Sequence, residues 1–397
     1  KDGTRHIGIV CTDNGGGFKD RNVTISSPTG EERTCTLLTH AITYGGRAEK
    51  EGTLQRIGKF GFGLQSTILH LCSEDSEGAV VITKNELESS YRYCKVDFMR
   101  MSRTGNYSLT QERGDISQLG HIPGPIDRPM QIGKSGTIIW LKDCKSEFNS
   151  KDEFVREAVK EFGMTYRKYL QSGIKIRING VEVEFNDPLC ENKLSKERLA
   201  DLPGPVFVDE FSVIFDGGKP GDDDGDINWK KEIINEETGD FAKINMKMVR
   251  LNATEVAKAN SRSQEDYGKD AEQKAGRKFN MANQGFYLVR NQRQIRGGEN
   301  LGLYTTQDRL NYFRSEITFP DCLDEFFGIE ADKSRLTMNR SLSQRLKEKI
   351  KPILARMRKD HNNEVADKRG QDDETEPEAE KIIASAKPMP KILASDK

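Results

Sequence analysis

Two glycine clusters, each next to a predicted regular element, constrain this sequence more than any other feature. The first follows a short apolar strand, HIGIVCTD at residues 6–13, and continues from Asp13 through Asn14 into three glycines. The second, RIGKFGFGLQST at residues 56–67, precedes a stretch whose apolar residues have helical spacing. Glycine accepts backbone conformations and close approaches that other residues do not. Both clusters therefore indicate turns, or places where the backbone meets a ligand.

Taken alone, the first cluster favours a plain turn, because glycine and asparagine tolerate positive φ. An EF-hand loop is excluded, since its alternating oxygen ligands and closing glutamate do not follow. The second cluster changes the balance, because Gly58, Gly61 and Gly63 expose N–H groups at the start of a predicted helix, where phosphate binds readily. It is no Walker A loop, since Gly-Lys-Ser/Thr is missing. It is also a poor Rossmann fingerprint, since Ser66 replaces the third glycine.

Residues 1–149 have the pattern of an α/β domain. The spacing of Leu64, Ile68 and Leu71 predicts a buried helix over residues 63–72. Short apolar or alternating runs predict strands at 6–13, 79–84, 90–98 and 134–141.

A second region begins at Ser150, which forms a capping-box pattern with Glu153 ahead of a predicted helix. The stretch IKIRINGVEVEF, residues 174–185, then alternates on both sides of Asn179-Gly180. This is the strongest short-range signal for a two-residue hairpin turn. The apolar stripe of the predicted helix consists of Phe154, Val155, Ala158, Val159, Phe162, Tyr166 and Leu170.

The remainder of the chain predicts further strands, one long helix and a tail. Strands are expected at 285–295 and 315–320. The helix has one apolar face, made of Leu342, Leu346, Ile350, Ile353 and Met357. The tail contains QDDETEPEAE and is expected to be disordered. The predicted parts are 1–149, 150–340, the helix 341–360 and the tail 361–397.

Composition excludes several classes of protein. Lys plus Arg (62) and Asp plus Glu (63) nearly cancel, so the overall charge argues neither for nor against nucleic acid. No apolar run approaches the roughly 18 residues of a membrane helix, and no signal-peptide pattern opens the chain. The seven cysteines form no CxxC pair, which indicates reduced thiols in an intracellular protein, cytoplasmic or nuclear, without a zinc site.

The order of the motifs is more informative than either cluster. A strand ends in Asp-x-Gly-x-Gly, a Gly-x-x-Gly-x-Gly motif later opens a helix, and a further strand begins with Gly-Thr. These motifs start at Asp13, Gly58 and Gly136. This order resembles the GHKL superfamily of ATPases, which includes gyrase B, Hsp90, MutL and histidine kinases. The resemblance implies a Bergerat-fold ATPase α/β sandwich, with ATP and Mg²⁺ as cofactors.

The resemblance also implies roles for individual residues. Asp13 would accept a hydrogen bond from the adenine amino group, and Thr137 would support the adenine-binding water. Gly15 and Gly17 would let the backbone pass beside the base, and residues 18–57 would form a mobile lid. The loop on the phosphate side would contain Gly58, Lys59, Gly61, Phe62, Gly63 and Leu64.

The second half resembles the S5-like α/β transducer domain that follows the ATPase module in MORC-like, bacterial Hsp90-like and gyrase-like ATPases. The stretches that carry this resemblance are 165–189, 285–295 and 319–336. Such domains present a lysine to the γ-phosphate, and Lys333 is the candidate here. A surface lysine in a charged loop is an equal alternative. Histidine kinases lack this domain, so that branch is disfavoured.

One feature of the superfamily is missing. A helix upstream of the aspartate should carry a glutamate that activates water and an asparagine that holds Mg²⁺, and residues 1–12 contain neither in a helical context. We expect this part of the domain to precede Lys1. The chain alone is then expected to lack the general base that hydrolysis needs. The alternative is a degenerate nucleotide binder that does not hydrolyse ATP.

The sequence thus predicts an ATP-hydrolysing conformational switch. ATP would close the lid, pair two protomers and signal to a transducer domain that acts on DNA or a protein client. The alternative is a nucleotide-, DNA- or protein-binding module with a vestigial pocket. Its candidate basic stretches are 290–296 and 345–359, which solvated faces would explain equally well. An NAD-dependent oxidoreductase is disfavoured, since the Rossmann strand context is missing.

Overall fold

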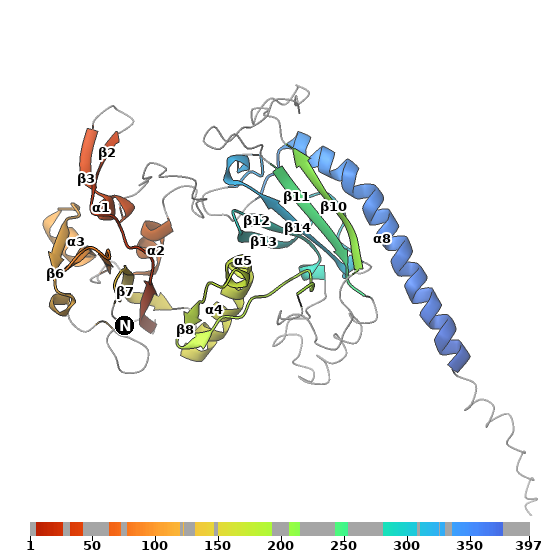
Figure 1. The fold of residues 1–397 in the computed structure, drawn as a ribbon, viewed down its shortest axis with the longest axis horizontal. Coiled ribbons are helices and arrows are strands. Elements are labelled where there is room, and N and C mark those ends of the chain that lie inside the picture. The colour runs from red at the N-terminus through yellow and green to blue at the C-terminus, as the bar shows by residue number, and fades with distance from the viewer. Residues whose placement is uncertain are drawn as a thin grey trace, which may run out of the picture.

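The computed structural model describes a mixed α/β protein with two five-stranded sheets and a long C-terminal helix (Figure 1). The structure describes residues 5–26, 32–42, 63–72, 78–119, 122, 132–146, 150–192, 206–214, 243–252, 281–307, 310–324, 326–329 and 336–375.

The first sheet has the strand order β1-β7-β4-β5-β6, and every neighbouring pair is antiparallel. The predicted strands at 6–13, 79–84, 90–98 and 134–141 are confirmed, although the last continues to Ser146. The sequence did not predict β6. The bounds are β1 Arg5–Asp13, β7 Gly136–Ser146, β4 Ala79–Lys84, β5 Tyr91–Val96 and β6 Gln111–Gly114.

Both faces of this sheet are covered, as the alternation along β4 shows. Ala79 and Val81 contribute to a core shared with three helices, while Val80 and Ile82 contribute to a second core on the opposite face. The second core includes Ile122 and Ile132. The helices are α1 Leu37–Ile42, α2 Gly63–Leu71 and α3 Phe98–Thr104. The helix predicted over 63–72 is therefore confirmed.

The stretch 18–57, which was expected to form a mobile lid, belongs in part to the folded layer. It contains the hairpin of β2 Asn22–Ser26 and β3 Glu32–Thr36, followed by α1. Leu38 of α1 is fully buried in the first core. The expectation was wrong for this helix, because its apolar side chains seal the sheet. Residues 43–57 lie outside the described part.

The segment after the first sheet begins with the predicted helix, but this helix is interrupted. In α4, Lys151–Thr165, the Ser150 side chain accepts a hydrogen bond from the Glu153 N–H at 3.1 Å, as the capping pattern predicted. The helix breaks at Tyr166, and α5, Arg167–Gln171, follows. The residues of the predicted apolar stripe are mostly only half-buried. Arg167, directly after the break, is buried instead.

The hairpin predicted around Asn179-Gly180 is confirmed. It joins β8, Arg177–Ile178, to β9, Val181–Glu182. Both turn residues have positive φ, 49° at Asn179 and 84° at Gly180, as a type I′ turn requires.

The second sheet has the order β10-β11-β14-β12-β13, with β12 and β14 parallel and the other pairs antiparallel. The single strand expected over 285–295 is instead a hairpin that turns at Asn291 and Gln292, both with positive φ. The sequence did not predict this turn, because the turn contains no glycine, the usual signal of a two-residue hairpin. The strand predicted at 315–320 corresponds to β14. The bounds are β10 Val206–Ile214, β11 Lys243–Arg250, β12 Gly285–Arg290, β13 Arg293–Glu299 and β14 Phe313–Phe319.

The same hairpin gives one arginine of the basic stretch 290–296, a candidate for DNA contact, a structural role. The Arg290 side chain is 3% exposed, and its Nε and Nη2 donate to the two carboxylate oxygens of Asp324 at 2.6 and 2.8 Å. Arg296 forms an ion pair with Glu299 at 3.2 Å. Arg290 is therefore committed to the interior of the domain, because a buried guanidinium needs a bidentate partner.

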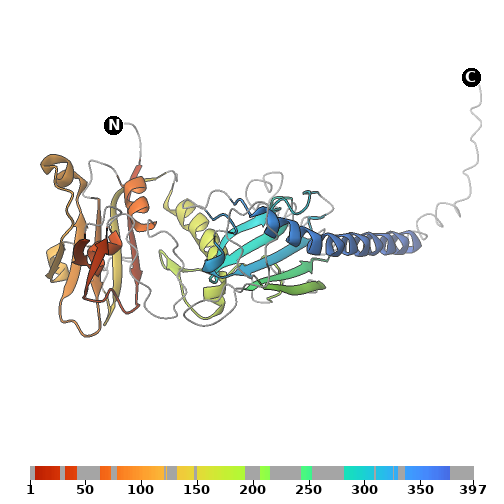
Figure 2. The same cartoon turned by 90° about the horizontal axis from the view of Figure 1, so that it is seen from above.

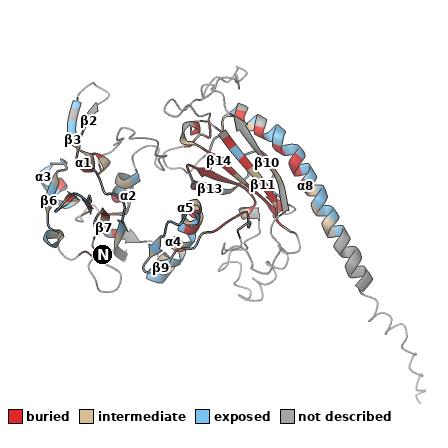
Figure 3. Ribbon diagram, viewed as in Figure 1, coloured by how far each residue is buried: buried red, intermediate tan, exposed pale blue. Residues whose placement is uncertain are grey.

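The C-terminal helix α8, Arg340–Thr375, packs one face against the second sheet. The predicted apolar face, Leu342 to Met357, is buried, and the opposite face is exposed (Figure 3). The helix does not end at residue 360 but continues to Thr375 and extends past the sheet (Figure 2). No helix among the described residues has the length and apolar character needed to cross a membrane.

Where α8 leaves the sheet, His361 stacks on Tyr312 with 3.8 Å between ring centroids, and Glu364 forms an ion pair with Arg250. Burial lowers the pKa of His361 below its ordinary value, Arg250 lowers it further, and Glu364 acts in the opposite direction. Above the ordinary histidine pKa the imidazole is neutral in both states. Below it, the unfolded chain binds the proton more readily, so the free energy of unfolding falls.

We therefore expect wild-type protein to lose more stability than His361→Phe between about pH 7 and pH 5. Phenylalanine keeps the stacked ring and removes the proton site. Urea unfolding at the two pH values measures the difference, with His70→Phe, on the exposed side of α2, as the control. Equal losses in wild type and His361→Phe would contradict this assignment.

Candidate functional site

A row of polar residues crosses the first sheet, one from each strand. Asp13 pairs with Thr137, Thr137 with Thr83, Thr83 with Arg92, and Arg92 with Arg113. Cross-strand partners project from the same face of a sheet. Thr83 lies two residues from Val81, so this is the face that the helices cover. Elsewhere that face is apolar, and the row marks the end of the sheet where its chemistry changes.

Asp13 ends β1, and its side chain is exposed. Its Oδ1 accepts a hydrogen bond from the N–H of Gly15 at 2.8 Å. This contact fixes the carboxylate at the mouth of the glycine cluster, beside the buried Thr137. Two residues that the sequence assigned to one function are thus brought together.

Two glycines near Asp13 are required by the fold itself. Gly17 has φ 69°, and a Cβ there would lie 2.3 Å from the Lys84 carbonyl oxygen. Gly136 has φ 145°, and a Cβ there would lie 2.2 Å from the Asp13 carbonyl oxygen. The loop after β1 and the start of β7 therefore approach the neighbouring backbone as closely as glycine permits.

Two other glycines face open space. A Cβ added to Gly16 or to Gly63 would meet nothing within 4 Å. Packing within the described protein therefore gives no steric reason for glycine at either position. Glycine at such positions leaves room for a ligand to approach the backbone.

Thr83 joins the loop to the sheet. Its buried hydroxyl accepts a hydrogen bond from the Phe18 N–H at 2.9 Å and donates one to the Gly136 carbonyl at 3.1 Å. One side chain on β4 thus holds both the loop that follows Asp13 and the strand that carries Thr137.

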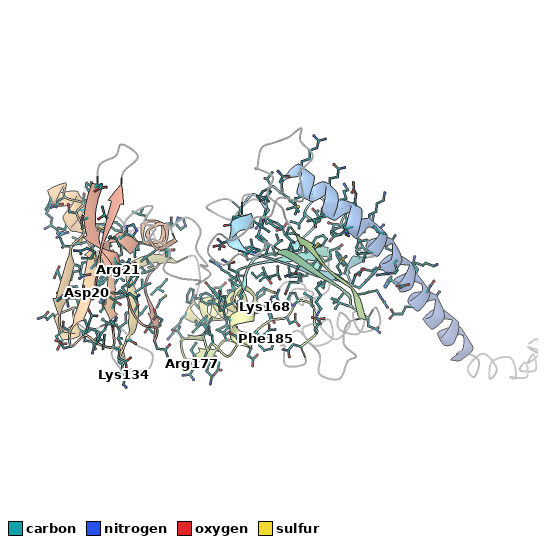
Figure 4. The ribbon with its side chains drawn as sticks, turned by 45° about the horizontal axis from the view of Figure 1, so that its top comes forward. Asp20, Arg21, Lys134, Lys168, Arg177 and Phe185 are labelled. Carbon is teal, nitrogen blue, oxygen red and sulfur yellow. The ribbon has the colours of Figure 1, made fainter. Side chains whose placement is uncertain are left out.

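Arg92 continues this arrangement on β5. Its side chain is fully buried, with Nε 2.7 Å from Glu88 Oε1, and its Nη2 donates to the Phe18 carbonyl. Beyond it, Arg113 forms an ion pair with Asp20, which Figure 4 labels in the unit built on the first sheet. The loop is therefore held from three strands.

The helix α2 packs on the helix-covered face of the first sheet. Cys72, directly after α2, forms a β-bridge with Cys144, close to the far end of β7. β7 begins at Gly136, beside Asp13. The Leu64 side chain, in the first turn of α2, packs on the core beneath the helices. Unpaired N–H groups of a helix N-terminus attract anions.

The arrangement combines an exposed carboxylate that accepts hydrogen bonds, open backbone at two glycines and a helix N-terminus. Such a set fits a ligand with an N–H donor at one end and negative charge at the other. The described residues contain no group of three or more His, Cys, Asp or Glu side chains that would hold a metal ion. ATP is one ligand of this chemical form, and the residues present fit it.

Some predicted residues are placed by the structure and others are not. Asp13, Gly15, Gly17 and Thr137 lie together, and Gly63 opens α2, where the Leu64 side chain packs on the helix-side core. The predicted residues outside the described part are Gly58, Lys59, Gly61, Phe62 and Lys333.

The sequence alone missed three residues of the site, namely Thr83, Glu88 and Arg92. A signal was present, because Thr83 and Arg92 are buried polar residues in strands whose other buried residues are apolar or aromatic. Their cross-strand pairing depends on sheet register, and the spacing of the two strands does not determine it.

Neither a family model nor a curated protein matches this sequence. Several solved structures are similar in shape. The ATPase and transducer domains of DNA topoisomerase II from Balamuthia mandrillaris match with a TM-score of 0.38 and 9% identity, covering 89% of this chain and 77% of that one. The ATPase domain of the mismatch repair endonuclease MutL from Aquifex aeolicus matches with a TM-score of 0.25 and 11% identity, covering 64% and 72%.

The same Aquifex aeolicus MutL domain in complex with ADP matches with a TM-score of 0.25 and 10% identity, covering 65% of this chain and 71% of that one. Identity and TM-score are low in all three comparisons.

The two kinds of glycine predict different mutational effects. Gly17→Ala places a side chain against the Lys84 carbonyl and in the left-handed region, so we expect it to lower the free energy of unfolding by roughly 1–3 kcal/mol. Gly16→Ala, the matched control, meets open space and is expected to change stability little. Urea unfolding of both variants provides the test. Equal losses would show that the loop does not rest on β4.

Proposed function

We propose that the chain binds ATP at the polar row of the first sheet and acts as an ATP-hydrolysing conformational switch of the GHKL type. The observation that carries this proposal is the pairing of Asp13 with Thr137 beside the open backbone of Gly16. In this proposal Asp13 accepts a hydrogen bond from the adenine amino group, and Thr137 holds a water beside it. A carboxylate acceptor selects adenine, since guanine presents an acceptor there.

The phosphates are assigned to the other end of the site. The first turn of α2 and the preceding Gly58 and Gly61 would supply N–H groups, and Lys333 would contact the γ-phosphate. Mg²⁺ would neutralise phosphate charge when it is bound with the nucleotide. We extend the proposal to ATP-driven pairing of two protomers in an intracellular setting. Binding is the readout of choice, because turnover also needs a general base.

Support for a switch comes from the connection between the two sheets. β7 begins at the site and ends at Ser146, and α4 starts at Lys151. After α4, Arg167 lies 2.5 Å from Glu316 on β14 and donates to Gln294 on β13 at 3.0 Å. The described part of this connection is therefore docked on the second sheet through α5.

The contacts between α5 and β14 are ion pairs that are largely buried. Arg167 is 1% exposed, and Lys168 also contacts Glu316 at 2.8 Å. The two cations offset burial and lower the pKa of Glu316. Removing one partner of a buried pair costs several kcal/mol, so α5 and the second sheet would move as one body.

Asp13→Asn tests the proposed base recognition. Asparagine keeps the size and replaces a charged acceptor, so we expect the affinity for Mg-ATP to fall roughly 10- to 100-fold. Isothermal titration measures it, with Asp152→Asn, an exposed acid in the first turn of α4, as the matched control. Unchanged affinity of Asp13→Asn, or no binding by wild type, would reject the proposal.

A second candidate function, contact with a nucleic acid, is favoured by the charge on α8. Residues 340–359 contain eight Lys or Arg and one Glu, in a chain whose net charge is −1. Residues 360–375 contain six acids and two bases. This order opposes the helix dipole, which favours acids near the N-terminus. Binding of an anionic partner would account for the basic residues in the first half of α8. The phosphate backbone of a nucleic acid is such a partner, because lysine and arginine side chains neutralise its charge.

Arg340, Lys347 and Lys351 are exposed and share one side of α8 by helical spacing. Changing all three to Gln is expected to weaken binding to a short duplex DNA and to lower the slope of log K against log salt by about one per lost contact. Fluorescence anisotropy at several salt concentrations measures both. The control changes the exposed Arg156, Lys160 and Lys175 to Gln. Equal effects of the two triple variants would exclude α8 as the contact.

A further inference from the structure

We infer that Arg92 is a positioning residue for nucleotide binding, and this inference rests on the proposed function. Arg92 does not reach the exposed mouth of the site. It holds the far end of the glycine loop, through the backbone carbonyl of Phe18, and so fixes the loop that follows Asp13. The inference assigns the Arg92–Glu88 pair to ligand affinity as well as to folding.

The geometry leaves Arg92 little freedom. Its Nε and Nη2 lie 2.7 and 3.0 Å from the two carboxylate oxygens of Glu88. Glu88 in turn accepts a hydrogen bond from the Asn85 N–H at 2.8 Å, within the turn that joins β4 to β5. The guanidinium is thus held on one side by a fixed carboxylate and donates on the other side to Phe18. A bidentate pair of this kind has a defined orientation.

An arginine at this position needs a reason other than core formation. The neighbours of Arg92 on the same face of β5, Cys94 and Val96, are buried apolar residues in the core beneath the helices. Apolar residues in place of a buried ion pair often leave stability unchanged or raise it. What Arg92 adds is a donor that reaches the loop backbone, which no apolar side chain supplies.

Charge balance around Arg92 is local. Asp20 lies 3.9 Å from Arg92 and forms an ion pair with Arg113, while Glu88 lies 3.9 Å from Arg113. The carboxylates of Asp20 and Glu88 therefore neutralise the guanidinium groups of Arg92 and Arg113. This balance lets the guanidinium stay buried without leaving an unpaired charge.

Phe18 becomes a fixed point because both of its backbone groups are held from the polar row. Its N–H donates to Thr83 and its carbonyl accepts from Arg92. Its ring packs against the core beneath the helices. Asp13 is fixed at the other end by its place in β1. Gly15, Gly16 and Gly17 thus span two fixed points, and the backbone of this segment, open at Gly16, is ordered before a ligand arrives.

The physical consequence is preorganisation. Glycine-rich segments lose much conformational freedom when they become ordered. If the loop is already ordered, ligand binding does not bear that cost. Loss of the Arg92 contact should therefore lower the affinity for every adenine nucleotide by the same factor, because the loop lies at the base end of the proposed site. Loss of a residue that contacts the phosphates would instead lower the affinities for ATP and ADP by different factors.

The test compares ATP and ADP affinities of the full chain, by titration well below the unfolding temperature of each variant. Arg92→Gln is expected to weaken both nucleotides about tenfold, the effect of ordering one or two residues. Arg92→Lys keeps the positive charge but loses the bidentate guanidinium, so its nucleotide affinities should lie between those of Arg92→Gln and wild type. Arg103→Gln, on the exposed side of α3, is the matched control and should bind as wild type does.

A second pair of variants keeps the test valid if Arg92→Gln does not fold. Thr83→Val removes the other anchor of Phe18 and should weaken ATP and ADP equally. Thr83→Ser keeps the hydroxyl and should restore the affinity, which a purely structural loss of the β-branched side chain would not allow.

The outcomes separate the two claims. If wild type binds neither nucleotide, the proposed function fails. If wild type binds but Arg92→Gln and Thr83→Val bind equally well, the proposed function stands and the positioning role is overturned. A loss confined to ATP would also overturn it, because Arg92 would then act at the phosphate end.

Discussion

The end of β4 leaves no room for a side chain where the loop after Asp13 crosses it, and the rest of the site depends on this close approach. A Cβ at Gly17 would lie 2.3 Å from the Lys84 carbonyl oxygen, and one at Gly136 would lie 2.2 Å from that of Asp13. Because the backbones touch, the hydroxyl of Thr83 reaches both the loop and β7. The position of the Asp13 carboxylate is therefore set by the sheet together with the loop that the sheet holds in place.

Apolar and polar residues occupy different parts of the helix-covered face of this sheet. The helix-covered face is apolar over most of its area and changes to Asp, Thr and Arg in one cross-strand row. Buried polar groups on such a row must be paired, because an unpaired one costs about 1–3 kcal/mol. Thr83 and Arg92 meet this requirement through the loop backbone. The fold and the proposed site thus use the same hydrogen bonds.

Local patterns in the sequence predicted much of this structure, and long-range pairing explains what they missed. The strand before Asp13, the helix after Gly63 and the hairpin at Asn179-Gly180 each follow from nearby residues. The turn at Asn291 was missed because it lacks glycine, and Thr83 and Arg92 were missed because register decides their neighbours. Asp13 and Thr137 were paired only through a family resemblance, since no spacing rule relates positions so far apart.

The central claim is that Asp13 recognises adenine within this row. The most direct measurement is a crystal structure of the chain with ADP. The account predicts the adenine amino group within about 3 Å of an Asp13 carboxylate oxygen, the ring beside Gly15 to Gly17, and the phosphates at the N-terminus of α2. A nucleotide bound elsewhere, or a base turned away from Asp13 in an ordered pocket, would contradict it.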